Sequence, residues 1–163
     1  STGEVMGIAG NFPAAFTKTQ LAIDYEPPRG GEVFISVNDG DKRNITAIAR
    51  SIARLGFSLV ATTGTARALR ASGIECEEVG KIHAGSHTIL DRIASGEIVL
   101  MINTPFGSST NTDGYEMRAA CVRHGVSYCT TLAGAQALIA GMEAVRETGL
   151  GVIALQDLPQ WEG

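Results

Sequence analysis

The sequence has 163 residues, which is enough for one domain with a well-buried core and short for two, because domains usually contain about 100–200 residues. Hydrophobic residues make up 44% of the chain and charged residues 18%, which is typical of a globular protein and excludes a disordered one. The formal net charge of -4 argues against nucleic acid as the main partner, and no apolar run reaches the ~18 residues that predict a membrane-spanning helix.

The amino-terminal part of the chain differs from the rest. A helix is predicted over Phe12–Leu21, because Asn11 can cap it and a proline stands in its first turn. The segment Glu26–Gly31 contains two prolines and two glycines, so we expect a linker there and a domain boundary at its end. The chain opens without an initiator Met, which we interpret as the start of a fragment from a longer protein.

Beyond this linker, apolar runs alternate with helical segments that end at a glycine, a residue favoured where a helix closes in a left-handed conformation. Alternating strands and helices pair in parallel, so we predict an α/β protein: a three-layer α/β/α domain with an open parallel sheet of about five strands. The apolar runs are Glu32–Val37, Phe57–Ala61, Cys76–Val79, Ile98–Ile102, Val126–Thr130 and Val152–Leu155, and the glycines are Gly56, Gly73, Gly96, Gly125 and Gly149.

The clearest helix follows Asp41, where apolar residues recur at a spacing of three and four from Ile45 to Leu55. Ile98–Ile102 is apolar throughout, which is typical of a strand covered by helices on both faces. An open parallel sheet binds its ligand beyond the carboxyl ends of its strands. We therefore expect the functional residues in the turns that follow the strands.

The turn after the second predicted strand carries the strongest signal for a binding site. Thr62 and Thr65 supply hydroxyls, Gly64 allows a ligand close to the backbone, and the next helix offers free amides to an anion. Lys42 and Lys81, from neighbouring turns, supply positive charge. Together these groups predict a site for a phosphate monoester.

Plainer interpretations of the same residues stay open. Thr62 and Thr65 would fit a helix N-cap as well as a ligand site, and Lys42 could be a solvated lysine. His83 and His87 are four residues apart but lack the glutamate of a metalloprotease helix, so no metal site is predicted.

Catalytic chemistry finds little support in the sequence. It lacks the motifs of a P-loop, a dinucleotide-binding turn and a serine nucleophile. Asp39 and Asp41 are the carboxylates of the first turn, and the turn after the third strand offers none, so a general base opposite a phosphate is hard to find. The three scattered cysteines suit apolar packing in a reduced, cytoplasmic compartment.

Several turn motifs occur together in the order and spacing of one family. They are Ser36–Lys42, Ala61–Ala66, Val79–His83, Asp91–Ile93, Ile102–Thr104 and Tyr128–Leu132. On these motifs the chain resembles the methylglyoxal-synthase-like domain, most closely the carboxyl-terminal allosteric domain of carbamoyl-phosphate synthase large chains. In this likeness residues 1–30 are the tail of a preceding ATP-grasp synthetase domain with a linker, and residues 31–163 are the Rossmann-like allosteric domain.

The resemblance implies a regulatory role within a glutamine-dependent, ATP-using ligase that serves pyrimidine and arginine biosynthesis. The full enzyme would use ATP with Mg or Mn and would pair with a small glutaminase subunit, whereas this part would need no cofactor and bind UMP or IMP. Lys42, Thr62, Gly64, Thr65 and Lys81 would hold the effector phosphate. The ribose or base would meet Asn103 and Asp113, and ornithine would face Tyr128 and Thr130.

Two departures from the family pattern affect the expected effector. Pro105 stands where a second threonine is common and therefore removes a hydroxyl and an amide donor, and Ser108 and Ser109 occupy places that can be basic. The alternative is a methylglyoxal synthase acting on dihydroxyacetone phosphate. That enzyme needs an aspartate after the third strand, and the sequence has none there.

Overall fold

The computed structural model describes residues 3–80, 88–105 and 112–160. The chain divides into two compact units, one formed by Ser1–Pro27 with Gln136–Gly163 and the other by Pro28–Ala135. Across the described residues, no helix has the length and apolar character needed to cross a membrane.

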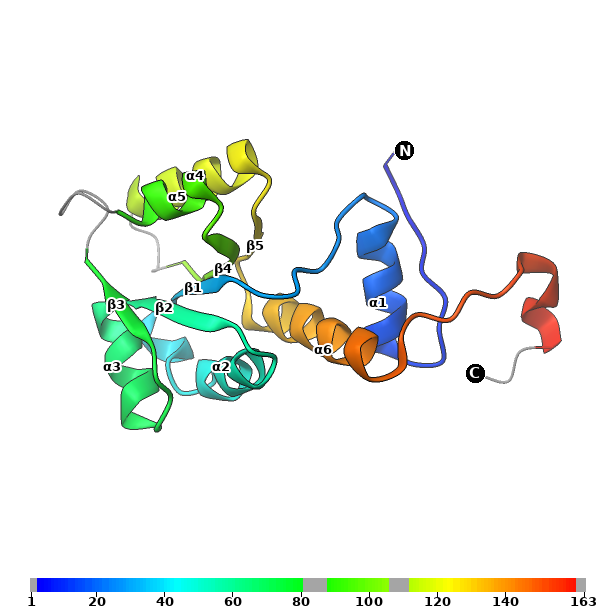
Figure 1. Cartoon of the computed structure of the whole chain (residues 1–163), viewed down its shortest axis with the longest axis horizontal. Helices are drawn as coiled ribbons and strands as arrows, with labels where there is room; N and C mark the ends of the chain where they lie inside the picture. The colour runs from blue at the N-terminus through cyan, green and yellow to red at the C-terminus, as the bar shows by residue number, and fades with distance from the viewer. Residues whose placement is uncertain (1–2, 81–87, 106–111, 161–163) are drawn as a thin grey trace. The chain divides into compact units, whose positions relative to one another are not determined.

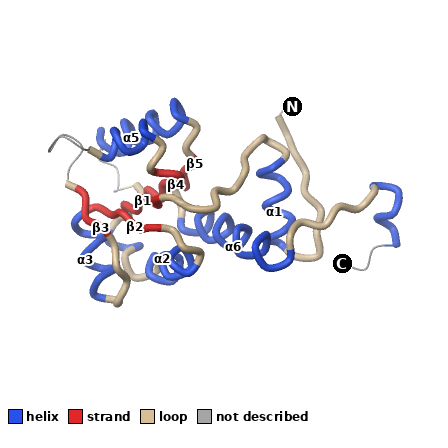
Figure 2. Tube along the Cα trace, viewed as in Figure 1, coloured by secondary structure: helices blue, strands red, loops and turns tan. Residues whose placement is uncertain are grey.

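The Pro28–Ala135 unit is a parallel sheet of five strands with helices between consecutive strands, as predicted (Figures 1 and 2). The strands lie in the order β3-β2-β1-β4-β5, and every neighbouring pair is parallel. In chain order the elements are β1 (Glu32–Ser36), the 3-10 helix η1 (Asp39–Asp41), α2 (Ile45–Arg54), β2 (Ser58–Thr62), α3 (Thr63–Ala71), β3 (Glu77–Val79), α4 (Ile89–Ser95), β4 (Ile98–Asn103), α5 (Thr112–His124) and β5 (Ser127–Cys129).

The helices of this unit form two layers on opposite faces of the sheet. Figure 1 shows α2 and α3 on one face and α4 and α5 on the other. From β1 the chain adds β2 and β3 on one side, then returns to place β4 and β5 on the other side of β1. The strand order therefore reverses between β1 and β4, and this is the place where open parallel sheets bind ligands.

The predicted hydrophobic patterns face the sheet. In α2 the stripe of Ile45, Ile48, Ala49 and Ile52 is buried, and β4 is an interior strand between β1 and β5. On the opposite face, Phe34 and its neighbours pack with residues of α4 and α5. That cluster consists of Phe34, Val60, Val79, Ile89, Ile93, Ile98, Met101, Met117, Ala120 and Cys121.

The five glycines predicted to end helices all have positive φ, from 69° at Gly125 and Gly149 to 83° at Gly56. The predicted strand Val152–Leu155, in contrast, is wrong. Residues 151–154 have no regular structure, a 3-10 helix, η2 (Leu155–Gln160), follows, and Val152 is 97% exposed. A run of four apolar residues has no periodicity that distinguishes a strand from a loop, and this run has no neighbouring strand to pair with among the described residues.

The other unit is built around α1 (Phe12–Leu21) and most of α6 (Leu132–Thr148). The Asn11 side chain accepts a hydrogen bond from the amide of Ala14 at 3.0 Å, so it caps α1 as predicted. At Gly141 of α6, a Cβ atom would lie 2.2 Å from Thr17 Oγ1, so glycine is needed for this close packing. The grouping of residues 136–163 with the amino-terminal segment was not foreseen from the sequence, and the proposed division into residues 1–30 and 31–163 stays a prediction.

Candidate phosphate-binding site

A row of polar side chains crosses the carboxyl ends of three neighbouring strands. Ser36 at the end of β1 pairs in register with Asn103 of β4, and Ser36 Oγ lies 3.4 Å from Thr62 Oγ1 of β2. Side chains alternate along a strand, so these residues share the sheet face of Phe34 and Met101, which α4 and α5 cover. The sheet register therefore places hydroxyl and amide groups beneath the first turn of α5.

A cavity of about 290 Å³ opens over the part of this row that contains Ser36 and Thr62. Four of the predicted phosphate-binding residues line it, and Asp113 of α5 lies on its wall. The lining residues are Phe34, Ser36, Val37, Lys42, Thr62, Thr63, Gly64, Thr65, Val79, Gly80, Ile89, Asp113 and Met117. Lys81, the fifth predicted phosphate ligand, lies outside the described residues, as do His83, His87, Ser108 and Ser109.

The threonines of the second turn do not act as helix caps. Thr62 occupies the N-cap position of α3, but its side chain makes no capping hydrogen bond; its hydroxyl instead contacts Ser36 Oγ and, at 3.3 Å, Thr65 Oγ1. Thr65 is 1% exposed, and its Oγ1 accepts a hydrogen bond from the amide of Val37 at 3.2 Å. The first turn of α3 therefore faces the cavity without a side-chain cap from Thr62.

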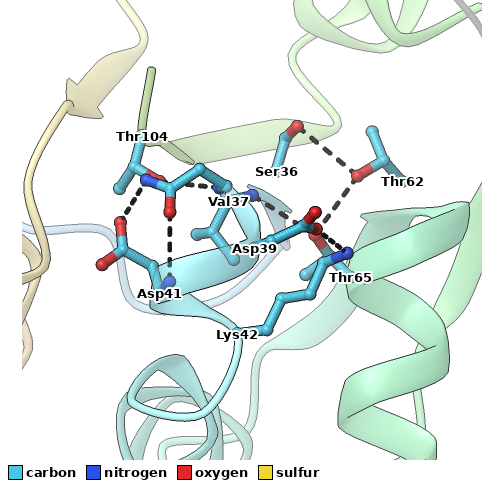
Figure 3. A network of polar contacts seen from close by, with 9 residues as sticks. Ser36, Val37, Asp39, Asp41, Lys42, Thr62, Thr65 and Thr104 are labelled. Carbon is cyan, nitrogen blue, oxygen red and sulfur yellow. Dashed lines mark hydrogen bonds and ion pairs between the residues drawn. The ribbon is translucent and has the colours of Figure 1, made fainter. Parts of the chain in front are cut away.

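Lys42 brings positive charge to this helix terminus (Figure 3). Its Nζ lies 2.9 Å from the position that a Cβ atom of residue 64 would occupy, so the absence of a side chain at Gly64 makes room for the ammonium group. Lys42 Nζ also forms an ion pair with Asp39. An ammonium group and backbone amides at a helix N-terminus together form an environment that favours an anion.

The turn that carries Lys42 is tied to the end of β4 by side chains that the sequence analysis did not single out. The backbone amide of Asn38 donates to Thr104 Oγ1 at 3.0 Å. The side-chain Nδ2 of Asn38 donates to Thr104 Oγ1 and to Asp41 Oδ2. Asn38 Oδ1 in turn accepts from the amide of Asp41. The sequence contained one signal for Asn38, because asparagine is a favoured residue at a helix N-cap. The contact with the buried Thr104 could not be predicted in this way, because it depends on the pairing of β1 with β4.

Asn103 is buried, and its side-chain amide has a donor without a partner in the described part of the chain. The residue is 4% exposed, and its Nδ2 atom has no hydrogen-bond partner among residues 3–80, 88–105 and 112–160. That nitrogen lies 3.3 Å from the position that a Cβ atom of Gly114 would occupy on α5. Asn103 does not appear among the cavity-lining residues, so the structure brings Asp113, but not Asn103, to the cavity wall.

The residues predicted to face ornithine lie elsewhere. Tyr128 of β5 is 40% exposed, Thr130 just beyond it is exposed, and neither lines the cavity. The cysteines have the character of packing residues, because burial raises the pKa of Cys121 and of Cys129 to about 11 and so disfavours the reactive thiolate. Within the described part of the chain, no group of three potential metal ligands occurs.

The fold and the cavity define a class: a three-layer α/β/α domain with a small-molecule cavity at the carboxyl edge of a parallel sheet. Residues 44–130 match the sequence model of the MGS-like domain. The chain belongs to this family.

Relatives with high sequence identity share the name carbamoyl phosphate synthase large chain. The chain is 50% identical over 159 residues to the carbamoyl phosphate synthase large chain, C-terminal section, of Methanopyrus kandleri, covering 97% of this chain and 29% of that protein. It is 43% identical to the carbamoyl phosphate synthase large chain of Myxococcus xanthus, covering 96% of this chain and 14% of that one. The chain thus spans less than a third of either relative.

Among solved structures, a methylglyoxal synthase from Elizabethkingia anophelis superposes with a TM-score of 0.57 at 13% identity, covering 83% of this chain and 94% of that one. At this identity the similarity concerns the fold alone. It agrees with the predicted three-layer architecture.

Proposed function

We propose that this chain is the regulatory part of a glutamine-dependent carbamoyl-phosphate synthase large chain and that its cavity binds a nucleoside monophosphate effector such as UMP or IMP. The names of the relatives support the first half of the proposal. The whole protein would then be an ATP-dependent ligase that uses Mg or Mn, works with a small glutaminase subunit and supplies carbamoyl phosphate for pyrimidine and arginine synthesis.

The convergence of Lys42, Gly64 and the uncapped first turn of α3 on one cavity carries the proposal. A phosphate oxygen there would accept hydrogen bonds from backbone amides and an ammonium group, and such charge-assisted bonds are about twice as strong as neutral ones. The hydroxyl of Thr62 adds another donor at the same wall. Lys81 is proposed as a second ammonium group.

The rest of the cavity suits the uncharged part of a nucleotide. Phe34, Val79, Ile89 and Met117 supply apolar surface, and the Asp113 carboxylate can accept hydrogen bonds from ribose hydroxyls or a base. Asn103 Nδ2, which has no partner within the described segments, would gain one if a ligand acceptor reached it. The volume of about 290 Å³ is at the lower end of the range for small-molecule sites.

Methylglyoxal synthase activity is the weaker candidate. It requires a carboxylate that removes a proton from the substrate carbon, and Asp41 of the first turn is hydrogen-bonded to Asn38 and absent from the described cavity lining. We expect no release of phosphate from dihydroxyacetone phosphate. Release that disappears in Asp41→Asn would favour this activity instead.

An ornithine site at Tyr128 and Thr130 is a separate proposal. Tyr128 pairs with Met101 of β4 in the edge strand β5, and Thr130 lies just beyond this strand. Their exposure leaves both residues accessible to a ligand or to another part of a longer chain. Ornithine binding that is lost in Tyr128→Ala but kept in Lys42→Gln would support two distinct sites.

Calorimetric titration of the 163-residue chain with UMP and with IMP tests the effector site. We expect binding of at least one nucleotide and a loss of about tenfold or more in Lys42→Gln, because hydrogen bonds to charged groups contribute about 1.5–3 kcal/mol. Arg43→Gln is the matched control, since Arg43 is the exposed neighbour and its substitution removes the same charge. The absence of heat for both nucleotides with a folded chain, or equal losses in the two variants, would count against the site.

A further inference from the structure

A carboxylate stands beside the cation of the phosphate site. Asp39 is the first residue of η1, three residues before Lys42, and its Oδ1 forms the ion pair with Lys42 Nζ (Figure 3). The Lys42 side chain is 29% exposed and lines the cavity, whereas the Asp39 side chain is 85% exposed and is absent from the described lining. The ammonium group that the ligand needs is therefore already shared with a group outside the cavity.

We infer that Asp39 determines the charge selectivity of this site, because it competes with the ligand for Lys42 and repels anions bound there. The inference rests on the proposed phosphate site and adds a residue with an opposing effect. Through Asp39 the site would favour a singly phosphorylated ligand over one that carries a di- or triphosphate.

The positions of the groups support a direct electrostatic effect. Lys42 Nζ contacts Asp39 Oδ1 and also lies 2.9 Å from the Cβ position of Gly64. A phosphate oxygen bonded to the ammonium group at about 2.8 Å would therefore lie no more than about 5 Å from Asp39 Oδ1. That separation is shorter than the Debye length of about 8 Å at physiological ionic strength, so the repulsion would be only partly screened.

The backbone around Asp39 is held in place, so the carboxylate cannot withdraw by movement of the turn alone. Asn38 caps η1 and is hydrogen-bonded to Thr104 at the end of β4 through both its backbone amide and its side chain. The side chain of Asp39 itself is exposed and can rotate into water. The competition is therefore modest: we expect it to weaken phosphate binding about three- to tenfold.

A second carboxylate extends the same selectivity along the cavity. Asp113 lies on the wall formed by α5, and Lys42 is the one cation among the described lining residues. Each phosphate group added to a ligand would bring further negative charge toward these carboxylates. A phosphate monoester with an uncharged, hydroxyl-bearing body would meet the repulsion from Asp39 with one phosphate group only and would bring no further negative charge toward Asp113.

Asp39→Asn tests the inference, with inorganic phosphate as the probe. We expect phosphate to bind the variant about three- to tenfold more tightly than the unaltered chain at about 10 mM ionic strength, and the gain to shrink at about 0.5 M because salt screens the repulsion. Glu75→Gln is the matched control: Glu75 is exposed, lies outside the cavity lining and loses the same charge, so its phosphate affinity should stay within about twofold. In Asp39→Asn the preference for UMP over UDP should also narrow.

The outcomes separate the inference from the proposed function. Equal phosphate affinity in the unaltered chain and in Asp39→Asn, or a gain that is the same in Glu75→Gln, overturns the role of Asp39 and leaves the phosphate site standing. A gain independent of salt also overturns it. Binding to neither form removes the proposed site and the inference together, whereas binding to Asp39→Asn alone supports strong competition by Asp39.

Discussion

Substitution of Gly64 by alanine should separate the stability of the domain from its affinity for phosphate. A Cβ atom at position 64 would lie 2.9 Å from Lys42 Nζ and 3.5 Å from its Cε atom, and outside its own helix backbone and chain neighbours it would meet no other described residue within 4 Å. The clash concerns the end of a flexible side chain, so the ammonium group can move away with little strain on the fold. Gly64 lies in the first turn of α3, where alanine is a better helix former by up to about 1 kcal/mol.

We therefore expect Gly64→Ala to keep or slightly raise the free energy of unfolding while weakening UMP binding about 10–100-fold. The loss corresponds to one hydrogen bond to a charged group, about 1.5–3 kcal/mol. Denaturant unfolding measures the first quantity and calorimetric titration the second. Unchanged affinity for UMP would refute the role assigned to Lys42 at this helix terminus.

Gly96→Ala provides the opposite control. Gly96 ends α4 at a φ of 80°, and a Cβ atom there would contact no described residue within 4 Å, so we expect the substitution to act through backbone strain. It should lower the free energy of unfolding by about 1–2 kcal/mol and leave UMP affinity unchanged. A loss of affinity here would mean that general destabilisation, and not the position of Lys42, explains the effect at Gly64.

Two further predictions concern buried polar groups. Asn103→Leu should leave the free energy of unfolding unchanged or raise it by about 1 kcal/mol, because it removes a buried donor that has no partner among the described residues, while UMP affinity falls. Marked destabilisation would show that the amide has a partner in solution. Burial raises the pKa of Cys121 and of Cys129 from 9.0 to about 11. Unfolding frees these thiols to ionise, so the free energy of unfolding should fall as the pH rises from 9.0 to about 11. Denaturation measured across this pH range should show a smaller fall in Cys121→Ala.

The sequence predicted the strand-to-helix connection at the second turn because its signals are local, while the phosphate site there stays a prediction. A strand that ends in Thr62, a glycine two residues later and a helix that follows at once are features of adjacent residues. Whether the hydroxyls cap that helix or face a ligand could not be decided locally. The hydrogen bond from the amide of Val37 to Thr65 joins residues 28 positions apart, and it requires the pairing of β1 with β2.

Other parts of the site depended on contacts that no short segment contains. The buried amide of Asn103 faces Gly114 because β4 lies beside β1 and α5 covers that face of the sheet. The sequence suggested Asn103 only through resemblance to a family. The ion pair of Asp39 with Lys42 is local in the sequence. Its proposed effect on a bound anion depends on the position of Lys42 beside Gly64, which belongs to a different strand–helix connection.

The amino-acid sequence by itself determined the alternation of strands and helices, the glycines that close the helices and the direct passage from strand to helix at Thr62 and Thr63. Apolar periodicity and backbone conformation act over a few residues, so they can be read without a structure. The tertiary structure alone decided the strand order, the absence of a strand at Val152–Leu155 and the grouping of α1 with α6. These features depend on which distant segments pair and pack, and that choice is made by the free energy of the whole chain.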